Sequence, residues 1–194
     1  IGRVAAGAIA CSILSELGIQ VHAYTRSIGP ISIPEESLSL EQAKLSPLYM
    51  PDRDASKKAE AYLLDRKKEK NSAGGIVECI VQGMPAGIGE PVFDKLDAVL
   101  AKAVMSIGAV KGVEIGDGFL AAAKTGIENN DGFYYDSNGN IKKSSNHAGG
   151  ITGGISDGST ILLRAAVKPT PSISSIQHTV NKNKENIEIE IGGR

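Results

Sequence analysis

Three short segments, two of which carry glycines, hold most of the residue types that could do chemistry in this sequence. They read SIGAVKG at residues 106–112, NHAGGITGG at 146–154 and KPTPSI at 168–173. Paired glycines let backbone N–H groups converge on an anion or a flat ring, because no Cβ stands in the way. These segments are therefore candidates for a backbone cradle around an anionic or planar ligand.

The third segment adds a cation and hydroxyls to this inventory. Lys168 supplies the positive charge, and Thr170 and Ser172 supply hydroxyl groups. Pro169 and Pro171 hold the same segment extended and rigid. A lysine followed by a stiff, hydroxyl-bearing loop suits a phosphate group.

A purely structural interpretation of the glycines stays open at this point. None of the segments is a P-loop or a GxGxxG dinucleotide fingerprint. Glycine pairs also mark bulges, tight bends and close packing of backbones. The histidines are interpreted as strand or loop residues rather than as catalysts, and they are His22, His147 and His178.

The elements that must position these segments follow from apolar periodicity. Residues 4–17 predict a helix that Gly18 ends, and its many small residues indicate deep burial. Residues 91–107 predict a second helix with a buried apolar stripe, which Gly108 ends. Alternation over 19–28 predicts a strand with Val21, Ala23 and Thr25 on one face.

Hairpins and strands dominate the second half of the chain. Asn138-Gly139 is a strong short hairpin signal. A strand over residues 161–168 and a closing hairpin that ends in NIEIEI follow it. The sequence therefore predicts an α+β fold in which antiparallel sheets cover a buried helical layer, as a single domain over residues 1–194.

Composition and charge argue against several classes of partner and site. The net charge is −1 and aromatic residues make up 4% of the chain, which gives no general attraction to nucleic acid or anionic membranes. No stretch approaches the roughly 18 apolar residues of a membrane span. The chain has no CxxC or HExxH motif, which argues against a metal. Cys11 and Cys79 are interpreted as core thiols of a reduced, cytoplasmic protein.

Long blocks of the sequence resemble chorismate synthase. They read GRVAAGAIA, GGIVECIVQGMPAGIGEPVFDKLDAVLAKAVMSIGAVKGVEIGDGF, NHAGGITGGISDG and KPTPSI, in the order of that family. The resemblance weakens only over residues 31–70 and in the segment NNDGFYYDSNGNIKKSS. Both ends look cut, and the sequence resembles the central half of a family chain of roughly twice its length.

The resemblance implies a lyase that converts 5-enolpyruvylshikimate 3-phosphate to chorismate by 1,4-elimination of phosphate. It implies reduced FMN as cofactor, a homotetramer with a β-α-β sandwich fold, and a place in the shikimate pathway of aromatic amino-acid biosynthesis. Whether NADP takes part in reducing the flavin stays open. The alternative is a non-catalytic flavin- or phosphate-binding fragment of the same fold.

The family's flavin contacts carry over to nine positions. Gly108 departs from the family, since many members have Asn there, and Asn71 stands in place of the usual aspartate. The family's catalytic histidines match none of the histidines in this chain, so the 194 residues alone are expected to be inactive. The resemblance implies FMN contacts at Gly108, Ala109, Gly153, Lys168, Pro169, Thr170, Pro171, Ser172 and Arg194.

Overall fold

The computed structural model describes residues 1–34 and 38–192. Arg194, one of the expected flavin contacts, lies outside the described residues. The chain forms two compact units. Unit 1 comprises residues 1–24 and 77–166, and unit 2 comprises residues 25–76 and 167–194. The boundary between them falls inside the strands β1, β3 and β9.

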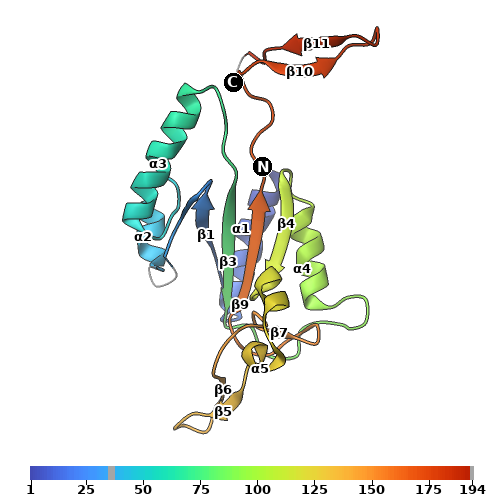
Figure 1. The fold of residues 1–194 in the computed structure, drawn as a ribbon. Coiled ribbons are helices and arrows are strands. Elements are labelled where there is room, and N and C mark those ends of the chain that lie inside the picture. Colours follow the sequence, from blue (N-terminus) through green and yellow to red (C-terminus); the bar gives the residue numbers. More distant parts are fainter. Residues whose placement is uncertain (35–37, 193–194) are drawn as a thin grey trace. The chain divides into compact units, whose positions relative to one another are not determined.

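The principal sheet has the strand order β2-β1-β3-β9-β4, and three two-stranded sheets accompany it: β5-β6, β7-β8 and β10-β11 (Figure 1). The mixture of helices with antiparallel pairs agrees with the predicted α+β class. The strands are β1 (Gln20–Ile28), β2 (Ile31–Ser32), β3 (Gly75–Gln82), β4 (Val110–Ile115), β5 (Phe133–Tyr135), β6 (Ile141–Lys143), β7 (Ile151–Thr152), β8 (Ile155–Ser156), β9 (Ile161–Val167), β10 (Gln177–Val180) and β11 (Asn186–Ile189). The helices are α1 (Gly2–Glu16), α2 (Leu40–Leu45), α3 (Arg53–Lys68), α4 (Leu96–Met105), the 3-10 helix η1 (Gly118–Ala123) and α5 (Gly126–Asn129).

Unit 1 has buried apolar residues on both faces of its strands. In β9 the alternation predicted from the sequence is confirmed, with Ile161, Leu163 and Ala165 buried. Ile80 of β3 and Val110 of β4 are buried on the other face, the one that carries Glu78, Glu114 and Arg164.

A row of polar side chains crosses four neighbouring strands of unit 1. The Tyr24 hydroxyl on β1 donates to Glu78 Oε1 on β3. Arg164 Nε on β9 donates to Glu78 Oε2 at 2.7 Å, and an Arg164 terminal nitrogen donates to Glu114 Oε2 on β4 at 3.2 Å. Burial opposes the charge of Arg164, but its hydrogen bonds to the two carboxylates outweigh that effect and raise the pKa of the guanidinium.

The strand predicted over residues 19–28 is confirmed as β1, but its apolar residues do not mark the buried face. Tyr24 and Ser27 are the buried residues of the strand, whereas Val21 and Ala23 are exposed. The physical reason is the polar row, because Tyr24 turns inward to reach Glu78.

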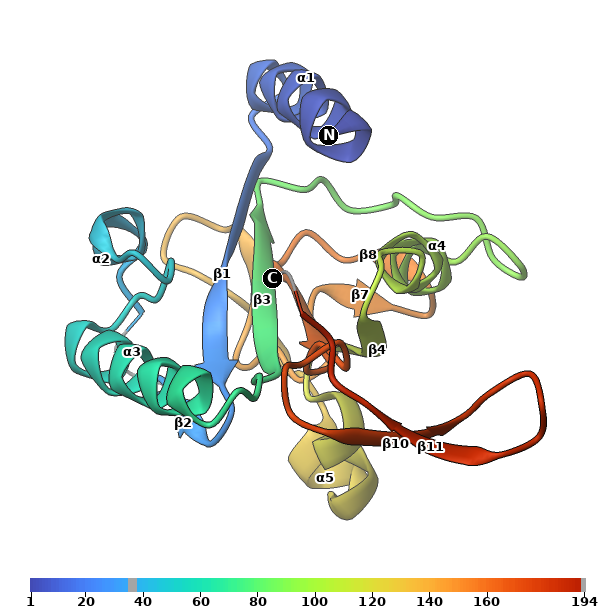
Figure 2. The ribbon, with the colours of Figure 1, turned by 90° about the horizontal axis from the view of Figure 1, so that it is seen from above.

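The prediction that the first helix is deeply buried is also wrong for this chain. None of the residues of α1 is buried, and Cys11 on it is exposed. The helix stands apart from the strands of its unit (Figure 2), and the Arg3 guanidinium donates a hydrogen bond to the Ser106 carbonyl at 3.1 Å. Small apolar residues show that a helix can be packed closely, but burial also needs an element that covers it.

Unit 2 packs the helices α2 and α3 around Met50 and Pro51, whose side chains are fully buried. Asp52 begins α3, since its carboxylate accepts a hydrogen bond from the Ala55 amide at 2.6 Å. The hairpin β10-β11 belongs to the same unit, and it is largely exposed.

Candidate functional site

Residues 146–158, the glycine-rich segment, form a tight hairpin in unit 1. β7 and β8 pair antiparallel with Thr152 opposite Ile155, so only Gly153 and Gly154 connect them. Their φ values are +64° and +84°. A two-residue turn with positive φ at both positions favours glycine, which explains the second glycine pair of the sequence.

The glycines of this segment differ in what surrounds them. A Cβ on Gly149 would meet the backbone of Gly116, and one on Gly150 would meet the Thr160 carbonyl at 2.6 Å. A Cβ on Gly154 would collide with the side chain of Lys95. At Gly153 nothing lies within 4 Å of that position. Close packing therefore accounts for Gly149, Gly150 and Gly154, whereas the space beside Gly153 is open for a ligand.

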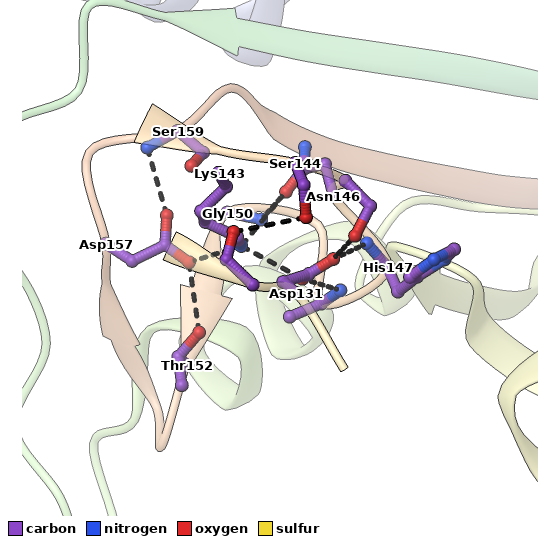
Figure 3. A network of polar contacts seen from close by, with 12 residues as sticks. Asp131, Lys143, Ser144, Asn146, His147, Gly150, Thr152, Asp157 and Ser159 are labelled. Carbon is purple, nitrogen blue, oxygen red and sulfur yellow. Dashed lines mark hydrogen bonds and ion pairs between the residues drawn. The ribbon is translucent and has the colours of Figure 1, made fainter. Parts of the chain in front are cut away.

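A buried ion network holds the same segment (Figure 3). Lys143, the last residue of β6, places its Nζ 2.8 Å from Asp157 Oδ2 and 3.0 Å from Asp131 Oδ2. The three side chains are 4%, 9% and 7% exposed, in that order. No sequence pattern marks this cluster, because the three residues are spread over 27 positions of the chain (131 to 157) and form no motif.

The network keeps its charges despite burial. Burial disfavours the ionised carboxylate of Asp131, but hydrogen bonds from the Ser145 hydroxyl and from the amides of Ala148 and His147 outweigh it and hold the pKa of Asp131 far below its usual value. Burial likewise opposes the charge of Lys143, and its bonds to Asp157 and Asp131 overcome this effect and raise its pKa. Three charged groups therefore persist beneath the glycine-rich segment at neutral pH.

His147 lies in a second polar cluster of unit 1. Its Nδ1 is 2.8 Å from Asp117 Oδ2 and 2.9 Å from Lys124 Nζ, and Lys124 also contacts Asp117. The hydrogen bond from Lys124 lowers the pKa of the Asp117 carboxyl. Burial opposes this lowering of the pKa, and His147 adds to it. The ring therefore has side-chain partners, while its backbone amide donates to Asp131 at 2.8 Å.

Gly108 and Ala109 lie beyond the C-terminal end of α4, where no protein atom approaches the Cβ position of Gly108 within 4 Å. Ala109 has φ +71°, which is unusual for a residue with a side chain. The Gly154 carbonyl accepts a hydrogen bond from the Leu96 amide at 2.8 Å, at the other end of this helix. Ten residues of helix rise about 15 Å, so the Gly153 turn and Gly108 lie at opposite ends of α4.

The segment from Lys168 to Ser172 belongs to unit 2 and is held there by its neighbours in that unit. The Ser72 hydroxyl donates to the Thr170 carbonyl at 2.7 Å, and the side-chain Nε2 of Gln177 donates to the Pro171 carbonyl at 2.7 Å. Lys168 is exposed, and it forms no ion pair with any residue of the ranges 1–34 and 38–192. Its ammonium is therefore accessible to an anionic ligand, whereas hydrogen bonds fix the backbone of the residues that follow it.

Asn71 has a local role in unit 2. Its amide donates to the Arg66 carbonyl at the end of α3 at 2.8 Å, and its side-chain oxygen accepts from the Ser72 amide at 2.8 Å. These contacts orient Ser72 and, through it, the Thr170 segment. His22 and His178 lie elsewhere, with His22 half-buried on β1 and His178 exposed beside Glu188 of β11.

Neither a metal cluster nor a membrane-spanning helix is found in the described part of the chain. Residues 1–34 and 38–192 contain no group of three or more His, Cys, Asp or Glu side chains that could hold a metal ion. Within the same ranges no helix combines the length and the apolar character needed to cross a membrane.

Comparison with known proteins assigns a family. A family model described as chorismate synthase matches residues 1–194. Over all 194 residues the chain is 62% identical to chorismate synthase of Lachnoclostridium phytofermentans and 57% identical to that of Agathobacter rectalis. It spans about half the length of these relatives, 53% in both cases.

A solved structure described as a crystal structure of chorismate synthase has the same fold. The TM-score is 0.80 at 33% sequence identity, and the match covers 86% of this chain and 54% of that one. The fold class predicted from the sequence is therefore confirmed.

Proposed function

Since the chain belongs to the chorismate synthase family, we propose that the protein carrying it converts 5-enolpyruvylshikimate 3-phosphate to chorismate with reduced FMN as cofactor. In this 1,4-elimination the C–O bond to phosphate breaks with its electron pair, one ring proton is lost, and a second ring double bond forms. The non-catalytic alternative is not favoured, because the matched relatives are chorismate synthases over the full extent of this chain.

The observation that supports the flavin part of the proposal is the geometry of Gly153. Its φ is +64° and no protein atom lies within 4 Å of its Cβ position, although neighbouring glycines are closely packed. A planar ring can approach such a backbone more closely than it can approach any residue with a side chain. Gly153 is therefore the glycine of this segment whose conformation and surroundings suit a ligand.

The residues of the chain fit the anionic part of the cofactor as well. Lys168 offers an exposed ammonium, and Thr170 and Ser172 offer hydroxyl donors on a segment whose backbone is held by Ser72 and Gln177. In each unit the chain presents its donors in a fixed arrangement, and less conformational entropy is therefore lost when a ligand binds. When bound, reduced FMN supplies transient electron density as phosphate leaves the substrate.

The finer family properties are part of the same proposal. A homotetramer, a cytoplasmic location and any use of NADP to reduce the flavin rest on family membership alone. The expected flavin contacts Gly108, Ala109 and Pro169, with Pro171 and Arg194, likewise remain proposals.

The test is a reconstitution of the intact protein that carries this chain. Purified protein is given 5-enolpyruvylshikimate 3-phosphate and reduced FMN under anaerobic conditions, and chorismate is followed by its absorbance. We expect turnover with reduced FMN and none with oxidised FMN, and a lack of chorismate under both conditions would refute the proposed reaction.

The role of Lys168 is tested by binding rather than turnover. Lys168→Ala removes a charge-assisted contact, and we expect reduced FMN to bind about 1.5–3 kcal/mol more weakly. Lys182→Ala, which removes another exposed lysine of unit 2, is the matched control and should leave the affinity unchanged. Equal affinity of both variants would show that Lys168 does not contact the flavin.

A further inference from the structure

Lys143 is the most deeply buried ammonium group for which the structure gives an ion pair. Its side chain is 4% exposed, and its Nζ bridges the carboxylates of Asp131 and Asp157. It also lies 3.5 Å from Asn146 Oδ1. All these residues belong to unit 1, and none is among the flavin contacts that the family implies.

Asp131 holds the beginning of the glycine-rich segment. Its Oδ1 accepts from the Ser145 hydroxyl at 2.6 Å and from the His147 amide at 2.8 Å, and its Oδ2 accepts from the Ala148 amide at 2.9 Å. These bonds leave the Asp131 carboxylate fully committed to residues 145–148 and to Lys143.

Asp157 holds the other end of the segment. Its Oδ1 accepts from the Ser159 amide at 3.0 Å, and its Oδ2 accepts from the Thr152 hydroxyl at 3.0 Å and from Lys143. Thr152 directly precedes Gly153 in the chain. Hydrogen bonds therefore link Lys143 to Asp157 and Asp157 to Thr152 (Figure 3). Thr152 leads directly into the open turn, which consists of Gly153 and Gly154.

The turn of Gly153 and Gly154 is held on its C-terminal side by other contacts, since the Gly154 carbonyl accepts from the Leu96 amide at 2.8 Å and Ser156 of β8 makes backbone hydrogen bonds to Gly87 and Ile88. β7 and β8 contain only two residues each, and short two-stranded ribbons are marginally stable in water. Gly153 has no protein neighbour at its Cβ position. On its N-terminal side the position of Gly153 therefore depends on Thr152 and on Asp157, which holds the Thr152 hydroxyl.

Stability is a poor explanation for a buried cation between two carboxylates. Replacing a buried ion cluster by well-packed apolar side chains is often neutral or stabilising, whereas charged partners impose one geometry. Bonds that fix a ligand-binding group from behind usually affect the binding that they support.

We propose that Lys143 is a positioning residue for the flavin site: by bridging Asp131 and Asp157 it holds both ends of the glycine-rich segment and so sets the position of Gly153. This inference rests on the proposed function, because it assumes that Gly153 contacts the flavin. It adds a role for a buried side chain that makes no contact with the ligand.

The experiment compares two variants in the intact protein that carries this chain. Lys143→Met removes the cation, and Thr152→Val removes only the hydroxyl that links the network to Gly153. Affinity for reduced FMN is measured anaerobically by titration, melting temperature by calorimetry, and backbone mobility of residues 147–159 by hydrogen exchange without flavin. We expect Lys143→Met to weaken flavin binding about tenfold and to speed exchange across residues 147–159.

Thr152→Val should weaken binding roughly threefold with little change in melting temperature, since Thr152 is exposed and valine has nearly the same shape as threonine. Two controls separate positioning from general stability. Ile80→Ala removes a buried side chain of the same unit, and it should lower the melting temperature without weakening flavin binding. Thr179→Val makes the same change as Thr152→Val on an exposed strand of unit 2, and it should have no effect.

Wild-type flavin affinity in both Lys143→Met and Thr152→Val would overturn the inference, as would an Ile80→Ala variant that loses affinity in proportion to its stability. If Lys143→Met does not fold, the affinity of Thr152→Val decides alone. A wild-type protein that fails to bind reduced FMN would instead reject the proposed function and this inference with it.

Discussion

At the scale of single residues, the glycines of one segment separate by their surroundings. Gly149, Gly150 and Gly154 are required because other atoms occupy the space of a Cβ, whereas Gly153 has open space and positive φ. The sequence shows a row of equivalent glycines. Only the packed structure distinguishes the one that faces outward.

This difference leads to a prediction for Gly153→Ala. The left-handed conformation makes alanine cost about 1–2 kcal/mol of stability, and its methyl group would occupy the face on which we place the flavin. We expect a folded variant whose affinity for reduced FMN, measured by anaerobic titration, falls clearly below that of the wild type.

Gly139→Ala is the matched control for that experiment. Gly139 has φ +77° and also no neighbour within 4 Å of its Cβ position, and it lies in the β5-β6 turn. Its replacement should cost similar stability and leave flavin binding intact. Equal flavin affinity in the two variants would contradict the placement of the ligand at Gly153.

At the scale of elements, the polar row across β1, β3, β9 and β4 ties four strands of unit 1 together. Glu78 lies at its centre and accepts from Tyr24 and from Arg164. Since the Glu78 side chain is 8% exposed, its carboxylate oxygens are hydrogen-bonded by these partners in place of water.

Arg164→Met tests this dependence. The substitution leaves the Glu78 carboxylate buried without its cation, and we expect a loss of about 3–5 kcal/mol in the free energy of unfolding. Urea denaturation followed by circular dichroism measures it. Adding Glu78→Gln to the same variant should recover part of the loss, and a double variant as unstable as the single one would argue against the ion pair as the cause.

Element boundaries show where local signals sufficed and where they did not. The Asn138-Gly139 hairpin is confirmed, with β5 and β6 paired around it, because its turn chemistry is local. The helix expected from residue 91 begins only at Leu96. Glu90 and Asp94 exchange backbone hydrogen bonds of 2.9 and 3.0 Å, and this tight turn takes the place of the first helical turn.

At the scale of the whole chain, the apolar residues of α1 are conspicuous. Val4, Ile9 and Ile13 are 77%, 66% and 59% exposed. Val4 and Ile13 point to opposite sides of α1, and a helix with exposed apolar side chains all round is typical of one that other surfaces cover. The family's β-α-β sandwich would provide one, and the relatives are nearly twice as long as this chain.

The 194-residue chain studied by itself should therefore bind a hydrophobic dye. We expect strong fluorescence of 8-anilinonaphthalene-1-sulfonate with this chain and weaker fluorescence after Val4→Ser, Ile9→Ser and Ile13→Ser are combined. Ser12→Ala on the same helix is the control. A signal that the triple variant does not reduce would show that the dye binds elsewhere.

The sequence by itself determined the local features and the family of this protein. The end of α1 just before Gly18, the β5-β6 hairpin and the alternation of β9 depend on residues that are neighbours in the chain. The family followed from long ordered blocks that the comparisons confirm over all 194 residues.

Only the tertiary structure decided which glycine is open and what holds it. Lys143, Asp131 and Asp157 meet although they are far apart in sequence, and a buried charge is stable only where folding brings its partners together. The face of α1 is a similar case, because its pattern shows what the helix can bury but not what covers it. Burial and ion pairing depend on contacts between distant residues, and no local pattern records those contacts.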